Sequence, residues 1–211
     1  MNLEKIRELA YTHLADRKAH KEREKGFIFY HGERTGKIAV RLRELVIPEN
    51  PEKDKILLAA GLFHDIAKGI EPHGEYGSIL VREILKDYCS KIELDEIAEL
   101  IYYHQKRKMS PDFSDSIKIF QDADTLDHFG TIEFWVNFHY YSYTEQPISE
   151  SVKFYQSHFE KQVEDIRQNL NYKLSIKIFD EKIDFAWNFA KRMAIEAEGE
   201  IYGLENILAE K

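Results

Sequence analysis

The sequence is poor in cysteine and lacks long apolar runs. Its single cysteine, Cys89, excludes an intramolecular disulfide and every zinc site that needs paired cysteines, and it suits a reducing cytoplasm. No run approaches the roughly 18 apolar residues that cross a bilayer, and the N-terminal segment 1–5 becomes charged at once, without the apolar core of a signal peptide. We therefore expect a cytoplasmic protein that makes no use of a membrane.

The chain also lacks an excess of basic residues. It carries 30 Lys and Arg against 38 Asp and Glu, which gives a formal net charge of −8. Because that charge repels a polyanion, we expect no binding to nucleic acid or to an anionic membrane through bulk charge. The 43% hydrophobic and 32% charged residues are typical of a globular protein. The length favours a single domain over residues 1–211.

Proline and glycine are few, 5 and 10 residues, and the apolar residues recur at helical spacing along almost the whole chain. The pattern predicts roughly eight helices, over about 3–14, 28–46, 51–69, 74–89, 93–107, 114 to beyond 135, 152–170 and 183–193. Residues 174–178 alternate as a strand would, but one strand cannot form a sheet. The predicted fold is all-α.

Side chains that can bind metal ions fall on these otherwise apolar helical faces. They are His31, His64, Asp65, His104 and Asp124. Any one of them alone is more often a hydrogen-bonded core or surface residue than a ligand, and two could satisfy each other as an ion pair. Four or five that converge on one core are better explained by a divalent cation, which offsets their repulsion and their desolvation together. Mixed imidazole and carboxylate ligands suit Mn, Fe, Co, Ni or Zn and argue against Ca²⁺.

In their order and setting, these residues resemble the signature of the HD-domain metal-dependent phosphohydrolases. That signature is a histidine on one helix, an adjacent His-Asp pair on a buried helix and a later aspartate, here His31, His64-Asp65 and Asp124. The resemblance covers about residues 25–135 and implies an HD-type helical bundle, to which about 148–205 add a C-terminal helical extension. It implies that a metal-activated water hydrolyses a phosphate ester or anhydride bond in a small phosphorylated substrate, such as a nucleotide.

Two further histidines, His73 and His104, fall where the sequence is similar to bacterial HD proteins that hydrolyse dinucleoside polyphosphates. This resemblance implies two metal ions per chain, with His64 and Asp65 shared between them and with His73 and His104 in the second site. In the alternative, one ion is bound, and these two histidines contact the phosphate or support the ligands. The sequence thus leaves one or two divalent transition-metal ions per chain open.

Two cationic side chains follow the predicted ligands by about one helical turn, Arg34 after His31 and Lys68 after His64. Both are placed to contact a phosphate beside the metal, and pairing with surface carboxylates is the alternative. Arg34 and Lys68 are predicted to be catalytic because developing negative charge on a phosphoryl group needs nearby cations. Asp65 completes the predicted catalytic set.

Other polar and aromatic groups are weaker candidates. Asp122, Asp127 and His128 flank Asp124 and could orient the ligands. The basic segment 106–108 reads better as a solvated helix end than as an electropositive rim. The aromatic side chains of 134–143 have the spacing of a core or an interface, with stacking on a nucleobase as the alternative.

Two other functions stay open at this stage. Some relatives with six ligands are di-iron oxygenases, which consume O₂ and need redox-active iron. A helical module that binds a nucleotide or a partner without turnover is the second alternative. The sequence identifies neither the substrate nor the oligomeric state, and a homo-oligomer stays open.

Overall fold

The computed structural model describes residues 1–209, and this part of the chain contains eleven α-helices, one 3-10 helix and no strand. In chain order they are α1 (Leu3–Leu14), α2 (Phe27–Val46), η1 (Pro51–Lys53), α3 (Asp54–Phe63), α4 (His73–Leu85), α5 (Lys91–Tyr103), α6 (Asp115–Asp127), α7 (Thr131–Tyr143), α8 (Ile148–Ser157), α9 (Phe159–Arg167), α10 (Lys173–Ala197) and α11 (Leu204–Ala209). The predicted all-α fold is confirmed.

The described helices outnumber the eight predicted ones because two predicted helices are divided and α11 is added. Gly130, the residue before α7, adopts φ +79° and ψ −135°, a non-helical conformation that favours glycine, and so separates α6 from α7. The helix predicted over 152–170 is broken at His158 into α8 and α9. The α-helix predicted to reach Gly69 ends at Phe63, and turns follow it.

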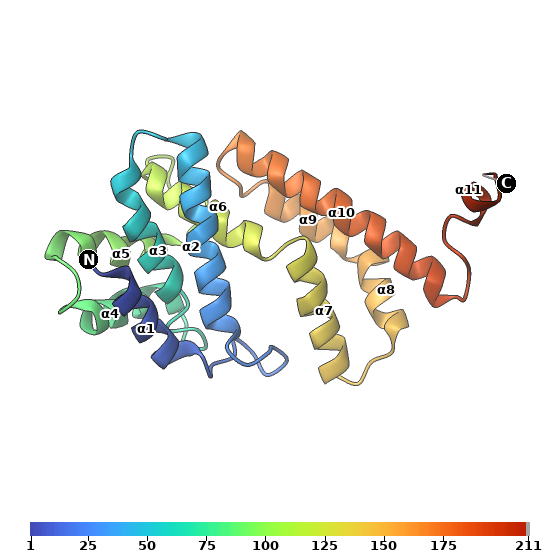
Figure 1. Ribbon diagram of the computed structural model, residues 1–211, viewed down its shortest axis with the longest axis horizontal. Coiled ribbons are helices and arrows are strands. Elements are labelled where there is room, and N and C mark those ends of the chain that lie inside the picture. The colour runs from blue at the N-terminus through green and yellow to red at the C-terminus, as the bar shows by residue number, and fades with distance from the viewer. Residues whose placement is uncertain (210–211) are drawn as a thin grey trace.

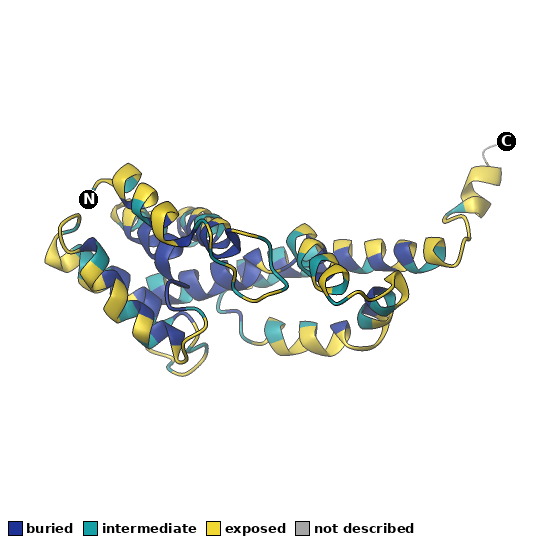
Figure 2. Cartoon of the chain, turned by 90° about the horizontal axis from the view of Figure 1, so that it is seen from below, coloured by how far each residue is buried: buried dark blue, intermediate teal, exposed yellow. Residues whose placement is uncertain are grey.

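The helices form two groups that lie side by side along the long axis of the molecule (Figure 1). Helices α1 to α6 make an N-terminal bundle, and α7 to α10 make a second group against the end of α6. The buried sides of the helices face inward in both groups (Figure 2), and one apolar cluster runs from Leu57 and Phe120 in the bundle to Tyr155 and Phe179 in the second group. Helix α11 lies apart from both groups (Figure 1).

Helices α2 and α3 cross at three glycines, which let the two backbones approach closely. A Cβ atom on Gly61 would lie 2.5 Å from the Cα atom of Gly36 and 2.8 Å from the carbonyl oxygen of Gly32. Only glycine fits this crossing. Because the crossing is so close, His31 on α2 and His64 directly after α3 face each other across it.

Side-chain caps fix the N-termini of α5 and α6. Ser90 and Glu93 form a capping box at the start of α5, and the Ser114 hydroxyl accepts a hydrogen bond from the Ile117 backbone N–H at the start of α6. These two helices carry His104 and Asp124 toward the bundle interior.

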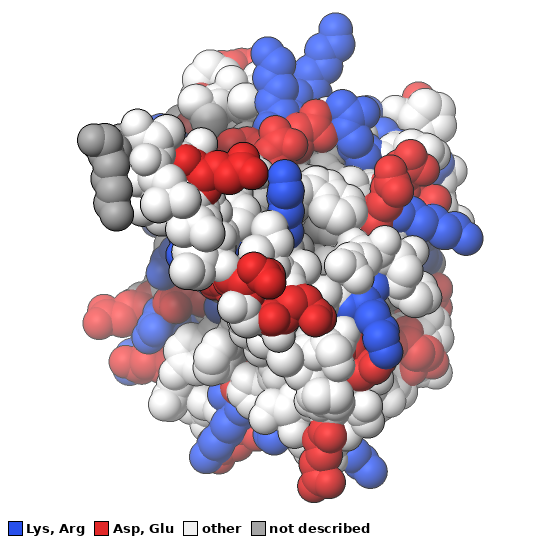
Figure 3. Space-filling model, turned by 90° about the vertical axis from the view of Figure 1, so that its right-hand side faces the viewer, with Lys and Arg blue, Asp and Glu red and all other residues white. Residues whose placement is uncertain are grey.

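The helices and the surface agree with two exclusions made from the sequence. None of the helices within residues 1–209 is both long and apolar enough to cross a bilayer. Acidic and basic side chains are interspersed over the described part of the face at the C-terminal end (Figure 3), so this face offers no continuous basic surface to a polyanion.

Candidate metal centre

The six predicted ligands lie together inside the N-terminal bundle, although five separate segments of the chain supply them. His31 comes from α2, His64 and Asp65 from the residues directly after α3, His73 from the start of α4, His104 from the residue after α5 and Asp124 from α6. All six are buried, and none has more than 6% of its surface exposed.

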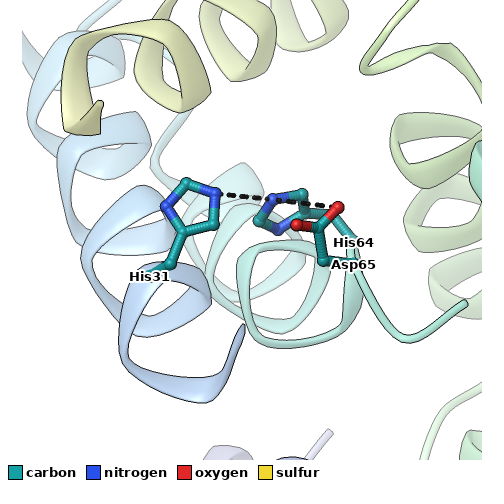
Figure 4. A group of neighbouring side chains, drawn as sticks. All are labelled: His31, His64 and Asp65. Atoms are coloured by element: carbon teal, nitrogen blue, oxygen red, sulfur yellow. Dashed lines mark hydrogen bonds and ion pairs between the residues drawn. The ribbon is translucent and has the colours of Figure 1, made fainter. Parts of the chain in front are cut away.

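One half of the centre is formed around His31. Its Nε2 atom lies 3.1 Å from Nε2 of His64 and 3.1 Å from Oδ1 of Asp124. Nε2 of His64 lies 3.5 Å from the same Asp124 oxygen. Figure 4 shows the two imidazoles pointing toward each other, with the Asp65 carboxylate beside them. Three or more ligand atoms from different helices thus lie within reach of one ion.

The other half of the centre is formed around Asp65. Its Oδ1 atom lies 3.1 Å from Nε2 of His73 and 3.8 Å from Nε2 of His104, and these two nitrogens are 3.3 Å apart. Ligand atoms of Asp65, His73 and His104 all lie within 4.8 Å of one another, and so do those of His31, His64 and Asp65. Asp65 therefore belongs to both halves of the centre.

The outer ring nitrogens of the four histidines are all occupied. Nδ1 of His64 donates to the carbonyl oxygen of Gly61 at 2.8 Å, and Nδ1 of His104 donates to that of Ile101 at 2.6 Å. Because each imidazole donates its Nδ1–H outward, its Nε2 lone pair is directed into the centre. This arrangement is typical of histidines that bind metal ions.

For the other two histidines, a carboxylate accepts the hydrogen bond from the Nδ1–H group. Nδ1 of His31 lies 2.7 Å from Oδ2 of Asp127, and Nδ1 of His73 lies 3.0 Å from Oε1 of Glu71. A carboxylate in this position fixes the orientation of the ring and makes the inner nitrogen a stronger ligand.

The donor atoms fit a divalent transition metal. Four imidazole nitrogens and two carboxylates converge, and within the described residues the buried Oδ1 atom of Asp65 has no hydrogen-bond partner. A buried carboxylate oxygen without a partner is costly, and a cation at this point would satisfy it. Mixed nitrogen and oxygen donors suit Mn, Fe, Co, Ni or Zn.

The proton affinities of these groups show how strongly the buried charges interact. Burial lowers the pKa of His31, but hydrogen bonds to Asp124 and Asp127 outweigh burial and raise that pKa to about 9. Burial and the neighbouring His64 lower the pKa of His104 to about 3. Burial disfavours the charged form of Asp65, yet His64, His73 and Lys68 hold its pKa well below 3.8. The centre thus stabilises ionised carboxylates inside the bundle.

Three cationic side chains surround the centre. Lys68 Nζ lies 3.5 Å from Oδ2 of Asp65, on the side of His73. Arg34 does not contact the six residues directly: its guanidinium forms two hydrogen bonds to Asp127, at 2.8 and 2.9 Å. Arg107 Nη2 lies 2.6 Å from Oδ2 of Asp124 on the opposite side. Lys68 and Arg107 therefore flank the centre, while Arg34 acts on His31 through Asp127.

The residues near Asp124 divide according to the helical faces that they occupy. Asp127 lies on the same face and contacts His31, and Nε2 of His128 lies 3.7 Å from Asp124. Asp122 points the other way and accepts hydrogen bonds from the backbone N–H groups of 171 and 172, at the start of α10. The expectation that Asp122 orients the ligands is wrong, because residues two apart on a helix face different directions.

Some residues of the centre carry no local signal in the sequence. Glu71 and Arg17 were missed: Arg17 donates hydrogen bonds to the carbonyl oxygens of Ile66 and Lys68 and so holds the segment that follows the His-Asp pair. The basic segment 106–108 does not act as one unit, because Arg107 alone of its three side chains reaches the centre.

Two of three comparisons with known proteins find matches. The family model described as the HD domain matches residues 28–128. No curated protein matches the sequence. Among solved structures, an HD-superfamily hydrolase from Bacillus thuringiensis superposes with a TM-score of 0.66 at 21% identity, covering 94% of this chain and 97% of that one. Bacillus subtilis YpgQ in complex with ADP superposes with a TM-score of 0.63 at 17% identity, covering 96% and 99%. These two likenesses establish the fold over nearly the whole chain.

Proposed function

We propose that the chain, whose residues 28–128 match the family model described as the HD domain, is a metal-dependent phosphohydrolase. The observation that carries the proposal is the position of Asp65, whose Oδ1 atom has no hydrogen-bond partner within the described residues and lies between two groups of buried imidazoles. A centre of this kind is suited to hold one or two divalent ions, with His31, His64 and Asp124 at one side of Asp65 and His73 and His104 at the other.

When bound, a divalent ion supplies Lewis-acid chemistry, since it lowers the pKa of water toward about 7 and neutralises phosphate oxygens. The chain supplies the rest of the mechanism. Lys68 lies beside Asp65 and Arg107 beside Asp124, so each can donate hydrogen bonds to an equatorial phosphate oxygen as negative charge develops. Arg34 is a positioning residue, because its guanidinium holds the carboxylate that orients His31.

The proposed substrate is a nucleotide or another small phosphorylated molecule. The support is that YpgQ, which shares the fold over nearly the whole chain, has a structure in complex with ADP. The cations around the centre suit an anionic substrate in a protein whose net charge is −8.

The test is hydrolysis by the purified full-length protein. A panel of nucleoside mono-, di- and triphosphates and p-nitrophenyl phosphate is incubated with Mn²⁺, Fe²⁺, Co²⁺, Ni²⁺ or Zn²⁺, and released phosphate or nucleotide is measured. We expect turnover with at least one of these metals and none in the presence of a chelator. Asp65→Ala should abolish turnover and leave the far-UV circular dichroism of the helices intact. Asp87→Ala, which removes an exposed carboxylate, is the matched control and should be fully active.

Each other outcome assigns a different function. Retained turnover in Asp65→Ala would contradict the role of the centre. Oxygen uptake that needs iron, without hydrolysis under anaerobic conditions with Mn²⁺, would indicate a di-iron oxygenase. Calorimetric binding of a nucleotide with no product under any metal would indicate a binding module.

A further inference from the structure

A pocket lies directly beside the Asp124 side of the centre, between the N-terminal bundle and α9. Its volume is about 340 Å³, and it is lined by Arg23, Arg107, Thr125, His128, Phe129, Val136, Gln162, Ile166 and Asn169. Two arginines and no carboxylate line this pocket, in a chain whose net charge is −8. The lining therefore has the charge of an anion site.

Arg23 is the cation at one wall of the pocket. It is half-buried in the segment before α2, and within residues 1–209 it forms no ion pair. Its guanidinium lies 5.6 Å from the centroid of the Phe27 ring, which stacks on His31 at 5.7 Å. Glu22 and Glu24, its neighbours in the chain, act on its charge without forming an ion pair with it, so the Arg23 guanidinium is available to an anion.

Arg107 connects the pocket to the metal centre. Its Nη2 atom contacts Asp124, while its buried Nε atom has no hydrogen-bond partner among the described residues. Arg107 thus has donor capacity left after it has engaged Asp124, and arginine suits the bidentate recognition of phosphate.

The remaining walls come from the end of α6, from α7 and from the C-terminal extension. Gln162 and Asn169 bring amide groups, and Val136 and Ile166 bring apolar surface. Amides can donate hydrogen bonds to phosphate oxygens without adding charge. The volume lies in the range of pockets that accept small organic ligands and so leaves room for more than one phosphate group.

We propose that this pocket is a second phosphate subsite: Arg23 binds a phosphate group carried by the leaving group of the substrate, and Arg107, which lies between the pocket and the centre, contacts both phosphates. The inference rests on the proposed function for its orientation: the phosphate under attack lies at the centre, and the second phosphate lies in the pocket. It favours substrates with two or more phosphates over those with one, and it gives the C-terminal extension a role in this preference.

The first test measures binding without turnover. The full-length protein, as purified, is titrated in a calorimeter with inorganic phosphate and, separately, with inorganic pyrophosphate. We expect Arg23→Gln to weaken pyrophosphate binding by about tenfold or more and to change phosphate binding much less. Lys21→Gln removes the same charge from an exposed neighbour outside the pocket and should behave as the wild type. Equal pyrophosphate affinities in the wild type and in Arg23→Gln would overturn the subsite.

The second test adds a negative charge where the fold tolerates it. Gln162 and Gln168 are both exposed, but only Gln162 lines the pocket. Gln162→Glu should raise KM for a nucleoside diphosphate by about tenfold and leave KM for p-nitrophenyl phosphate, which has one phosphate, unchanged. Gln168→Glu should affect neither substrate. An equal rise for both substrates would overturn the subsite, because it would show a general loss of anion affinity.

The two proposals fail separately. If no substrate is hydrolysed but Arg23→Gln still loses pyrophosphate binding, the subsite stands and the phosphohydrolase does not. If hydrolysis proceeds while Arg23→Gln and Gln162→Glu match their controls, the phosphohydrolase stands and the subsite is wrong.

Discussion

Asp127 fixes the His31 imidazole on the side away from the centre: its Oδ2 atom lies 2.7 Å from Nδ1 of His31, and the same carboxylate accepts two hydrogen bonds from Arg34. The carboxylate fixes the imidazole so that its Nε2 atom points at His64 and Asp124. Arg34 in turn neutralises a carboxylate that is buried almost completely. The three residues form a support that reaches from the surface to the metal centre.

We expect Asp127→Asn to weaken metal binding by about ten- to a hundredfold, because an amide orients His31 less well and makes it a poorer ligand. The measurement is metal retained per chain after dialysis against a graded series of chelator concentrations. Asp87→Asn, a surface change of the same chemistry, should retain metal as the wild type does. Unchanged retention in Asp127→Asn would show that His31 needs no support from this carboxylate.

His104→Ala tests whether the second half of the centre holds its own ion. If two ions are bound, elemental analysis should fall from about two to about one metal per chain, because His31, His64 and Asp124 are left intact. His13→Ala, which removes an exposed histidine of α1, is the control and should keep the full content. An unchanged metal content in His104→Ala would favour a single ion with His73 and His104 as supporting groups.

The sequence predicted the parts of this molecule that depend on local pattern. Helical periodicity gave most helices of the bundle, and the spaced His31, His64-Asp65 and Asp124 pointed to one centre. Local pattern is not sufficient beside Asp124, because the neighbouring Asp122 and Asp127 look alike in the sequence. Only their helical phase separates them: Asp127 shares the face of Asp124, and Asp122 faces α10.

Apart from the ligands that the family resemblance brings together, contacts between distant segments could not be predicted. Arg34 and Asp127 are 93 residues apart, and Arg17 reaches the Lys68 carbonyl across 51 residues. Such pairs depend on how helices pack, which a single sequence does not fix. The pocket beside the centre was missed for the same reason, since residues before α2, after α5 and from α9 meet there only in the folded chain.

Glu133 makes stability depend on pH. The Tyr155 hydroxyl donates to its carboxylate at 2.9 and 3.0 Å, yet burial dominates and raises the pKa of Glu133 to about 7. A carboxyl whose pKa is raised above its unfolded value of 4.5 favours folding below that value and loses this contribution as the pH rises through about 7.

Glu133→Gln should therefore stabilise the protein at about pH 8 by on the order of 2 kcal/mol relative to its effect at about pH 5, because the amide is never charged. Urea unfolding at the two pH values measures this difference. Glu164→Gln, an exposed carboxylate on α9, should show no such dependence. If the free energies of unfolding of the wild type and of Glu133→Gln differ by the same amount at both pH values, the raised pKa of Glu133 is contradicted.

Gly61→Ala tests the crossing that brings His31 and His64 together. In an open helix, alanine would stabilise by about 1 kcal/mol relative to glycine. Here the new Cβ would lie 2.5 Å from Gly36 Cα, so α2 and α3 must move apart. We expect a loss of about 1–3 kcal/mol in urea unfolding and a lower metal content, because the two imidazoles separate. Gly199→Ala, where φ is +81° and nothing lies within 4 Å, should cost stability through the backbone alone and keep its metal. The sign of the Gly61→Ala effect is decisive: a more stable variant with its metal retained would mean that close contact between α2 and α3 does not hold the two ligands in place.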